Sequence, residues 1–197
     1  SYDVLIFLTW EAGMTRQLPK LTAGLCLWLG SMGGASADEC PAALDFQKRL
    51  LAGDEVIHLC ELMQDKVVLV VNTASKCAYT PQYEGLEQLY ENYRERGLVV
   101  AGFPSNDFAN QDPGSEKEIR DFCRLTYSVK FPLFEKVRVK GQGRDEFYEH
   151  LVAVTGDEPR WNFHKYLIDR EGRVVASFPS QVTPGDGQLI DAIEELL

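Results

Sequence analysis

The stretch that decides the fold reads Val67-Val-Leu-Val-Val-Asn-Thr-Ala-Ser-Lys-Cys-Ala-Tyr-Thr-Pro81. Its unbroken apolar run, 67–71, predicts a strand at 67–72 that is buried on both faces. Thr80 and Pro81 have the residue types of a helix N-cap and a first helical position. Cys77 is therefore expected between a buried strand and a helix start, where unpaired N–H groups and the helix dipole stabilise a thiolate. A buried structural cysteine is the alternative, and the position alone leaves both open.

The rest of the chain predicts alternating strands and helices. A second buried strand at 98–103 follows a helix that Gly97 ends, which makes a parallel strand–helix–strand unit. The other expected elements are a hairpin or irregular lead-in at 46–60, helices at 81–96, 115–127, 145–154 and 187–197, a strand start at 131–134, and a hairpin of strands 165–169 and 173–178. Ser115 and Glu118 fit a capping box. This order predicts an α/β, thioredoxin-like fold, with a central mixed sheet flanked by helices.

The first 37 residues differ from the rest. Residues 1–13 precede Met14 and are interpreted as an upstream extension. Residues 14–37 follow the pattern of a signal peptide: Arg16 and Lys20, an apolar stretch at 21–34, and Ala35-Ser36-Ala37 as a cleavage site. An uncleaved anchor is the alternative, although the apolar stretch is short for a membrane span. The domain is expected at 38–197, in an exported protein, periplasmic or secreted.

Charge and cysteine content limit the partners and the disulfides that the chain is expected to have. The net charge is −10 and there is no long basic run, which argues against a nucleic-acid partner. Export implies an oxidising compartment, so Cys40 and Cys60 are predicted to form a disulfide, with two unrelated thiols as the alternative. Cys123 falls on the apolar side of a predicted helix and is interpreted as structural.

Three separated segments together resemble the glutathione peroxidases. They are Val71-Asn-Thr-Ala-Ser-Lys-Cys77 running into Thr80-Pro-Gln-Tyr-Glu-Gly-Leu86, then Gly102-Phe-Pro-Ser-Asn-Asp-Phe108 with Gln111-Asp-Pro-Gly114, and Trp161-Asn-Phe-His-Lys-Tyr166. The resemblance implies that Cys77 is the peroxidatic residue and that Gln111, Trp161 and Asn162 surround its sulfur. Their N–H groups would stabilise the thiolate and the charge that develops on the leaving oxygen.

The resemblance also implies a reaction cycle. Cys77 would reduce hydrogen peroxide and organic hydroperoxides through a sulfenic acid, with no metal or cofactor. Ser105 stands where many members of the family carry a second cysteine, so the chain is expected to use one thiol and an external reductant, such as glutathione or a thiol protein. The short segment between Phe134 and Trp161 implies a monomer that resembles the phospholipid-hydroperoxide type. No stable membrane anchor is expected, because the apolar stretch at 21–34 is short. Ala78 stands where the family often has glycine, which would strain a backbone of positive φ.

Other functions remain as alternatives. A dithiol oxidoreductase would need a second cysteine at Thr80, and a peroxiredoxin a threonine at Ala74. A peroxide sensor or redox relay, in which oxidised Cys77 passes its state to a partner protein, shares the first chemical step. A binding module with an inert site predicts no reaction of Cys77 with peroxide.

Overall fold

β3 (Val67–Thr73) lies at the centre of a four-stranded sheet in the computed structural model, which describes residues 40–197. It pairs in parallel with β4 (Leu98–Pro104) and antiparallel with β5 (Lys165–Ile168), and β5 pairs antiparallel with β6 (Val174–Phe178). The strand order is β4-β3-β5-β6, which confirms the mixed sheet. The predicted extension and signal peptide, 1–13 and 14–37, lie outside the described residues.

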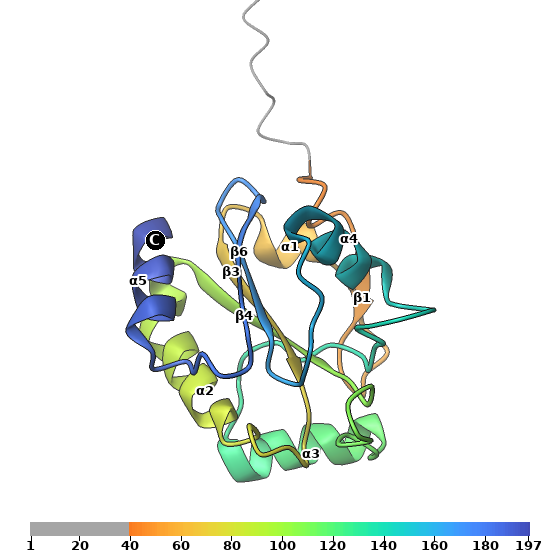
Figure 1. Cartoon of the computed structure of the whole chain (residues 1–197). Coiled ribbons are helices and arrows are strands. Elements are labelled where there is room, and N and C mark those ends of the chain that lie inside the picture. Colours follow the sequence, from red (N-terminus) through yellow and green to blue (C-terminus); the bar gives the residue numbers. More distant parts are fainter. Residues whose placement is uncertain (1–39) are drawn as a thin grey trace, which may run out of the picture. The chain divides into compact units, whose positions relative to one another are not determined.

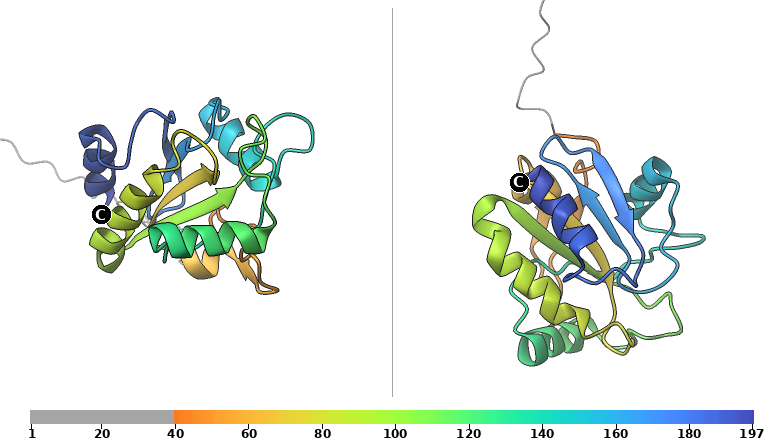
Figure 2. Two further views of the ribbon diagram at one scale, coloured as in Figure 1. Left: turned by 90° about the horizontal axis from the view of Figure 1, so that it is seen from below. Right: turned by 60° about the vertical axis from the view of Figure 1, so that its left-hand side comes forward.

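Helices cover both faces of this sheet, which explains the unbroken apolar run of β3. Val67, Leu69 and Val71 face one core, whereas Val68 and Val70 face the other. The first core is shared with α2 (Gln82–Tyr93), α3 (Glu116–Tyr127) and α5 (Gly187–Leu196), and the second with α1 (Leu59–Met63) and α4 (Glu146–Thr155). α2 and α5 lie on one face of the sheet, and α3 crosses the end where β3 and β4 finish (Figures 1 and 2).

The lead-in is a small hairpin that a disulfide closes. β1 (Gln47–Arg49) pairs antiparallel with β2 (Val56–His58). Cys40 and Cys60 are disulfide-bonded, as predicted, across a sequence separation of 20 residues. A loop of that length corresponds to a stabilisation of about 3 kcal/mol through the unfolded state.

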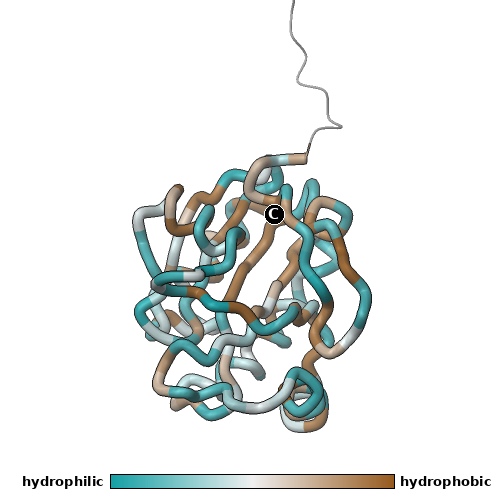
Figure 3. The backbone as a smooth tube through the Cα atoms, turned by 90° about the vertical axis from the view of Figure 1, so that its right-hand side faces the viewer, coloured by the Kyte–Doolittle hydropathy of each residue, from teal (hydrophilic) through white to brown (hydrophobic). Residues whose placement is uncertain are grey.

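The hydropathy of the residues agrees with this layered arrangement of sheet and helices. Hydrophobic residues colour the inner strands, while the outer loops are mostly hydrophilic (Figure 3). Among residues 40–197, none of the helices combines the length and the apolar character that crossing a membrane requires.

The predicted start of the first long helix is wrong. α2 begins at Gln82, and Thr80 does not cap it. The Thr80 hydroxyl is occupied instead by the turn that precedes the helix, where it accepts from the Cys77 N–H and donates to the Ala74 carbonyl, both at 2.9 Å. The helix ends earlier than predicted, because a 3₁₀ turn, Arg94–Arg96, continues it to Gly97 at φ 105°. Gly97 is the predicted stop.

The prediction that a strand starts at Phe131 is also wrong. Leu133 and Phe134 form only isolated bridges, to Gly102 and Leu50. Proline has no N–H to continue a ladder. The Pro132 carbonyl accepts from the Gly102 N–H and the Phe134 N–H donates to the Gly102 carbonyl, both at 2.9 Å, so the backbone hydrogen bonds of this segment to β4 are limited to Gly102. The remaining predicted elements are present with ends shifted by at most two residues, and the Ser115–Glu118 capping box is confirmed.

We expect Gly102→Ala to destabilise the protein by about 1–3 kcal/mol. A Cβ at Gly102 would lie 2.6 Å from Leu133 Cδ2 and 3.1 Å from Phe131 Cε2, against a segment that both isolated bridges hold. Gly187→Ala is the control, because a Cβ at this first residue of α5 meets nothing within 4 Å. Urea denaturation of both variants checks this, and equal stabilities would contradict the packing argument.

Candidate active site

Cys77 lies in a tight turn between β3 and α2. It is 7% exposed. The Tyr79 N–H donates to its Sγ at 3.4 Å, and the Cys77 N–H donates to Thr80 Oγ1. The turn, not the first turn of α2, therefore provides the backbone N–H that reaches the sulfur. Ala78 is not among the described residues with positive φ, so the expected strain at that position is absent.

The Gln111 loop is fastened to the residues just before Cys77. The Gln111 carbonyl accepts from the Lys76 N–H at 2.9 Å. Asp112 Oδ1 accepts from the Ser75 N–H at 3.0 Å and from the Ser75 hydroxyl at 2.6 Å. Asp112 is fully buried, and this burial raises the pKa of its carboxyl group. These bonds set the position of the Gln111 side chain relative to the Cys77 turn.

The third segment is a turn, 161–164, that Asn72 holds against the end of β3. Asn72 is fully buried; its Nδ2 donates to the Trp161 carbonyl at 3.2 Å and its Oδ1 accepts from the His164 N–H at 3.0 Å. Phe163 takes φ 63° in this turn, and its N–H donates to the Asn72 carbonyl at 2.7 Å. A single buried amide thus positions both Trp161 and Asn162.

The structure brings part of the predicted set together. Asn162 is fully buried, and its Nδ2 donates to Gln111 Oε1 at 2.9 Å, which joins two of the three predicted partners. Trp161 is 36% exposed, and its ring centroid lies 5.6 Å from that of Phe108. Within residues 40–197, the hydrogen bond that reaches the Cys77 sulfur comes from Tyr79, not from the Gln111, Trp161 or Asn162 side chains. The three side chains occupy the two segments that flank the Cys77 turn.

A buried lysine joins the start of α2 to the Trp161 turn. Lys165 is fully buried, and its Nζ donates to Gln82 Oε1 at 2.8 Å and to the Phe163 carbonyl at 2.7 Å. Burial disfavours its charge and lowers its pKa to about 7, while the negative charge of Asp186 acts in the opposite direction. Gln82 Nε2 in turn donates to the Ser180 carbonyl at 2.7 Å. The amine therefore contributes to the position of the turn that carries Asn162.

Lys165→Met is expected to flatten the pH dependence of stability above neutral pH. Lysine in the unfolded chain has a pKa near 10.5, against about 7 in the folded protein, so the unfolded state binds more protons between these values. Stability of the parent protein therefore rises with pH there, by at most about 1.4 kcal/mol per pH unit from this group. The free energy of unfolding is measured from pH 7 to pH 9 for both proteins, and other titrating groups cancel in the difference. Lys76→Met, at an exposed lysine, should keep the rise, and an unchanged slope in Lys165→Met would contradict the prediction.

Two clefts flank the site. One, of about 450 Å³, is lined by Ser75 and Lys76, by the Pro113–Gly114 turn, and by Glu118, Ile119 and Phe122 of α3. The other, of about 340 Å³, lies beside Trp161 and His164. Burial lowers the pKa of His164 to about 4, so this imidazole is neutral at pH 7. Cys77 itself lines neither cleft, and the first is reached from its neighbour Lys76.

Sequence reasoning missed Asn72, Asp112 and Lys165 as organisers of the site. Asn72 and Lys165 carried a usable signal, because each is a polar residue within a buried strand, and such groups need internal partners. Asp112 carried none, since an aspartate before Pro113 is ordinary in a solvated turn.

Ser105 and Cys123, the other two residues considered in the sequence analysis for the chemistry of Cys77 or as a structural thiol, are both buried. Ser105 is fully buried at the end of β4, where its N–H donates to the Thr73 carbonyl at 3.0 Å. Cys123 is fully buried on α3, as predicted, and burial raises the pKa of its thiol to about 11. Cys77 and Cys123 are the free cysteines of the described residues.

Comparison with known proteins identifies the family of this chain. The family model for glutathione peroxidase matches residues 44–152, more than half of the chain. The chain belongs to the glutathione peroxidase family. It is 45% identical over 157 residues to the glutathione peroxidase homolog BsaA of Halalkalibacterium halodurans, covering 78% of this chain and 98% of that protein. It is 50% identical over 137 residues to the hydroperoxy fatty acid reductase Gpx2 of Synechocystis sp., covering 70% and 88%.

A solved structure agrees with this assignment. The structure described as Trgpx in apo form superposes with a TM-score of 0.63 at 32% identity, over 80% of this chain and 96% of that one. Membership of the family makes the chain a hydroperoxide-reducing peroxidase with a thioredoxin-like α/β fold. A hydroperoxide substrate and a thiol reductant follow from this membership.

Proposed function

We propose that Cys77 reduces hydrogen peroxide and organic hydroperoxides, with Gln111, Trp161 and Asn162 as its polar partners and an external thiol as reductant. The observation that carries the proposal is the joining of three distant segments around the Cys77 turn, through Lys76 to Gln111, Gln111 to Asn162, and Asn72 to Trp161. Each segment contains one of the family-like motifs.

The chemistry follows from the groups present. The Cys77 thiolate attacks one peroxide oxygen, the O–O bond breaks, and the departing alkoxide or hydroxide takes a proton to give an alcohol or water. The sulfur is left as a sulfenic acid. N–H donors that face the reacting oxygens stabilise the charge that develops on the leaving oxygen. In the peroxide complex the Asn162 amide and the Trp161 indole would supply such donors after small side-chain rotations.

One thiol then restores the enzyme in two steps. A first glutathione attacks the sulfenic sulfur and releases water, which leaves a mixed disulfide. A second glutathione attacks that disulfide, releasing oxidised glutathione and the Cys77 thiol. Ser105 supports the external route, because its buried hydroxyl cannot resolve a sulfenic acid.

A second candidate cycle uses Cys123, and a specific observation favours it. Cys77 and Cys123 share the same apolar core, and α3 buries only Ile119 and Cys123. Because α3 buries so little, partial unwinding of this helix costs little apolar burial and would free the Cys123 thiol to attack oxidised Cys77. The product would be an intramolecular disulfide, which a dithiol protein would reduce.

The larger cleft supports a preference for bulky hydroperoxides. It begins at Lys76, beside the reacting residue, and it is lined on its α3 side by Ile119 and Phe122. An open, partly apolar cleft of about 450 Å³ accommodates an alkyl chain attached to the peroxide. We propose that organic hydroperoxides, including those of fatty acids, are substrates.

Location and assembly complete the proposal. Residues 14–37 would act as a signal peptide and 38–197 as the exported domain, periplasmic or secreted, working as a monomer. The Cys40–Cys60 disulfide supports export, since disulfides persist mainly in oxidising compartments.

The test is a single-turnover oxidation of the reduced full chain with one equivalent of tert-butyl hydroperoxide. Dimedone traps sulfenic acids, and peptide mass spectrometry locates the adduct. The proposal expects the adduct on Cys77, with reversal by glutathione when dimedone is omitted. A Cys77–Cys123 disulfide, reversed by a dithiol protein but not by glutathione, would establish the second cycle instead.

Two other outcomes would overturn the proposal. A stable mixed disulfide with a protein partner, without turnover by any small or protein thiol, would indicate a redox relay. Unmodified Cys77 after exposure to peroxide would leave an inert site. Steady-state consumption of hydroperoxide with each reductant, compared between hydrogen peroxide and a fatty-acid hydroperoxide, tests the proposed substrate preference.

A further inference from the structure

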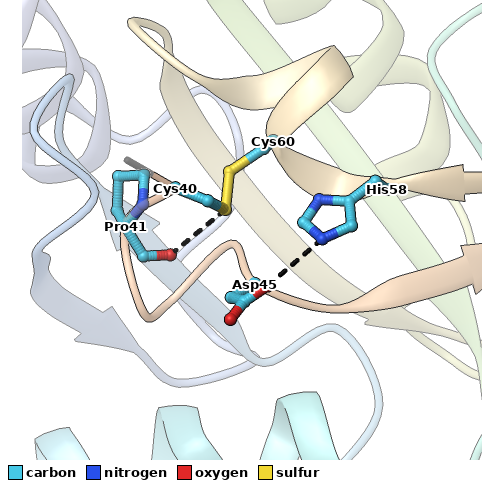
Figure 4. Close-up of a disulfide and its surroundings, with 5 residues drawn as sticks. All are labelled: Cys40, Pro41, Asp45, His58 and Cys60. Carbon is cyan, nitrogen blue, oxygen red and sulfur yellow. Dashed lines mark hydrogen bonds and ion pairs between the residues drawn. A yellow bond between two sulfur atoms is a disulfide. The ribbon is translucent and has the colours of Figure 1, made fainter. Parts of the chain in front are cut away.

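Two cysteines and a histidine meet at the N-terminal edge of the described domain, away from the Cys77 site. One ligand atom from each of Cys40, His58 and Cys60 lies within 4.8 Å of the others, and all three residues are half-buried. Figure 4 shows the His58 ring beside the disulfide, with Asp45 below both. We call these three residues the Cys40/His58/Cys60 cluster.

Backbone contacts other than the disulfide hold the His58 and Cys60 side of this cluster. Register pairing in the β1–β2 hairpin sets Gln47 opposite His58, and the Leu59 N–H donates to the Phe46 carbonyl at 2.9 Å. Leu44 and Leu59, on the two sides of the cluster, are buried in the same core. Reduction of the disulfide would therefore leave His58 and Cys60 in place, with Cys40 only four residues before the buried Leu44.

The donor set suits a borderline-soft divalent cation. Two thiolates and a neutral imidazole are among the usual zinc ligands, and tetrahedral Zn–S bonds of about 2.3 Å place two sulfurs about 3.8 Å apart. The Cα atoms of Cys40 and Cys60 lie 5.9 Å apart, so small side-chain rotations reach this spacing.

Asp45 lies outside the cluster and contacts the His58 ring. His58 Nε2 lies 3.2 Å from Asp45 Oδ1. An Nε2–H donated to this carboxylate leaves the Nδ1 lone pair for a metal and orients the ring, the usual second partner of a zinc-bound histidine. The His58 and Asp45 side chains are 29% and 68% exposed, so the cluster lies near the protein surface.

We propose that the reduced protein binds one Zn²⁺ through Cys40, His58 and Cys60, with water as the fourth ligand. A dithiol opens the disulfide, giving two cysteine thiols and the oxidised dithiol, and the metal displaces one proton from each thiol. The disulfide and the metal are thus alternative occupants of one site, chosen by the redox state. This inference does not depend on the peroxidase reaction.

The test adds cobalt chloride, a spectroscopic substitute for zinc, to the phosphine-reduced full chain under nitrogen. We expect one Co²⁺ per chain with thiolate charge-transfer absorption, displaced by zinc chloride and absent from the oxidised protein. Cys60→Ser and His58→Ala should each weaken binding at least tenfold, and Asp45→Asn about tenfold to a hundredfold. Cys123→Ala should leave it unchanged.

Asp45→Asn keeps the disulfide in the oxidised protein, so it separates metal affinity from a folding defect. Circular dichroism of the reduced variants provides the matching check on folding. The proposal is overturned if the reduced protein shows no thiolate–cobalt absorption. It is also overturned if the absorption persists undiminished in His58→Ala and Cys60→Ser, because the metal would then use other cysteines.

Discussion

Cys77→Ser is expected to slow the reaction with tert-butyl hydroperoxide at least about a thousandfold, as loss of a catalytic nucleophile does. A serine hydroxyl is nearly isosteric with the thiol, but it stays protonated at neutral pH and is a poor nucleophile. The turn itself should survive, because Thr80 Oγ1 accepts from the backbone N–H of residue 77, not from its side chain. The rate is measured as loss of hydroperoxide in single turnover.

The matched control is Cys123→Ala, which removes the other free thiol of the described residues. It should keep the rate of the first step, whichever thiol later restores the enzyme. A Cys77→Ser protein that reacts within tenfold of the parent would refute Cys77 as the reacting residue. Loss of the reaction with peroxide in Cys123→Ala would instead indicate that Cys123 attacks the peroxide.

Asn72→Ala is expected to lower the peroxide rate on the order of tenfold to a hundredfold, although within residues 40–197 the hydrogen bond to the Cys77 sulfur comes from Tyr79 and not from Asn72. The variant removes the hydrogen bonds to the Trp161 carbonyl and the His164 N–H, so the turn that carries Trp161 and Asn162 loses its anchor. The buried His164 N–H, left without a partner, costs about 1–3 kcal/mol, so the stability should fall as well.

Asn92→Ala is the control, because Asn92 is an exposed residue on α2, and it should change neither quantity. Both proteins are assayed at a temperature where circular dichroism shows them folded. A rate equal to that of the parent in folded Asn72→Ala would show that the position of the Trp161 turn does not matter for the reaction. The stability and rate measurements thus separate anchoring from catalysis.

Local sequence patterns predicted most of the fold. The apolar run at 67–71 predicted a strand buried on both faces, and its side chains alternate between the two cores of the structure. Ser115 and Glu118 predicted a helix start by a hydrogen-bond pattern only three residues long, which needs no distant partner. The two errors, at Thr80 and at Phe131–Phe134, occurred where a distant or irregular partner competes with the local signal. Thr80 bonds within the Cys77 turn, and the Pro132 carbonyl bonds to β4.

By itself the sequence determined the order of the elements and the family motifs, and it predicted Cys77 as the reactive residue, because these depend on short-range propensity and on residue identity. Only the tertiary structure decided how the site is held. Asn72 bonds to residues 89 and 92 positions away, and Asn162 bonds to Gln111 51 positions away. Such contacts arise when buried polar groups, cut off from water, must find partners inside the fold. The burial of Lys165, which lowers its pKa, likewise follows from tertiary packing, in which its amine bonds to Gln82 at the start of α2 and to the Phe163 carbonyl.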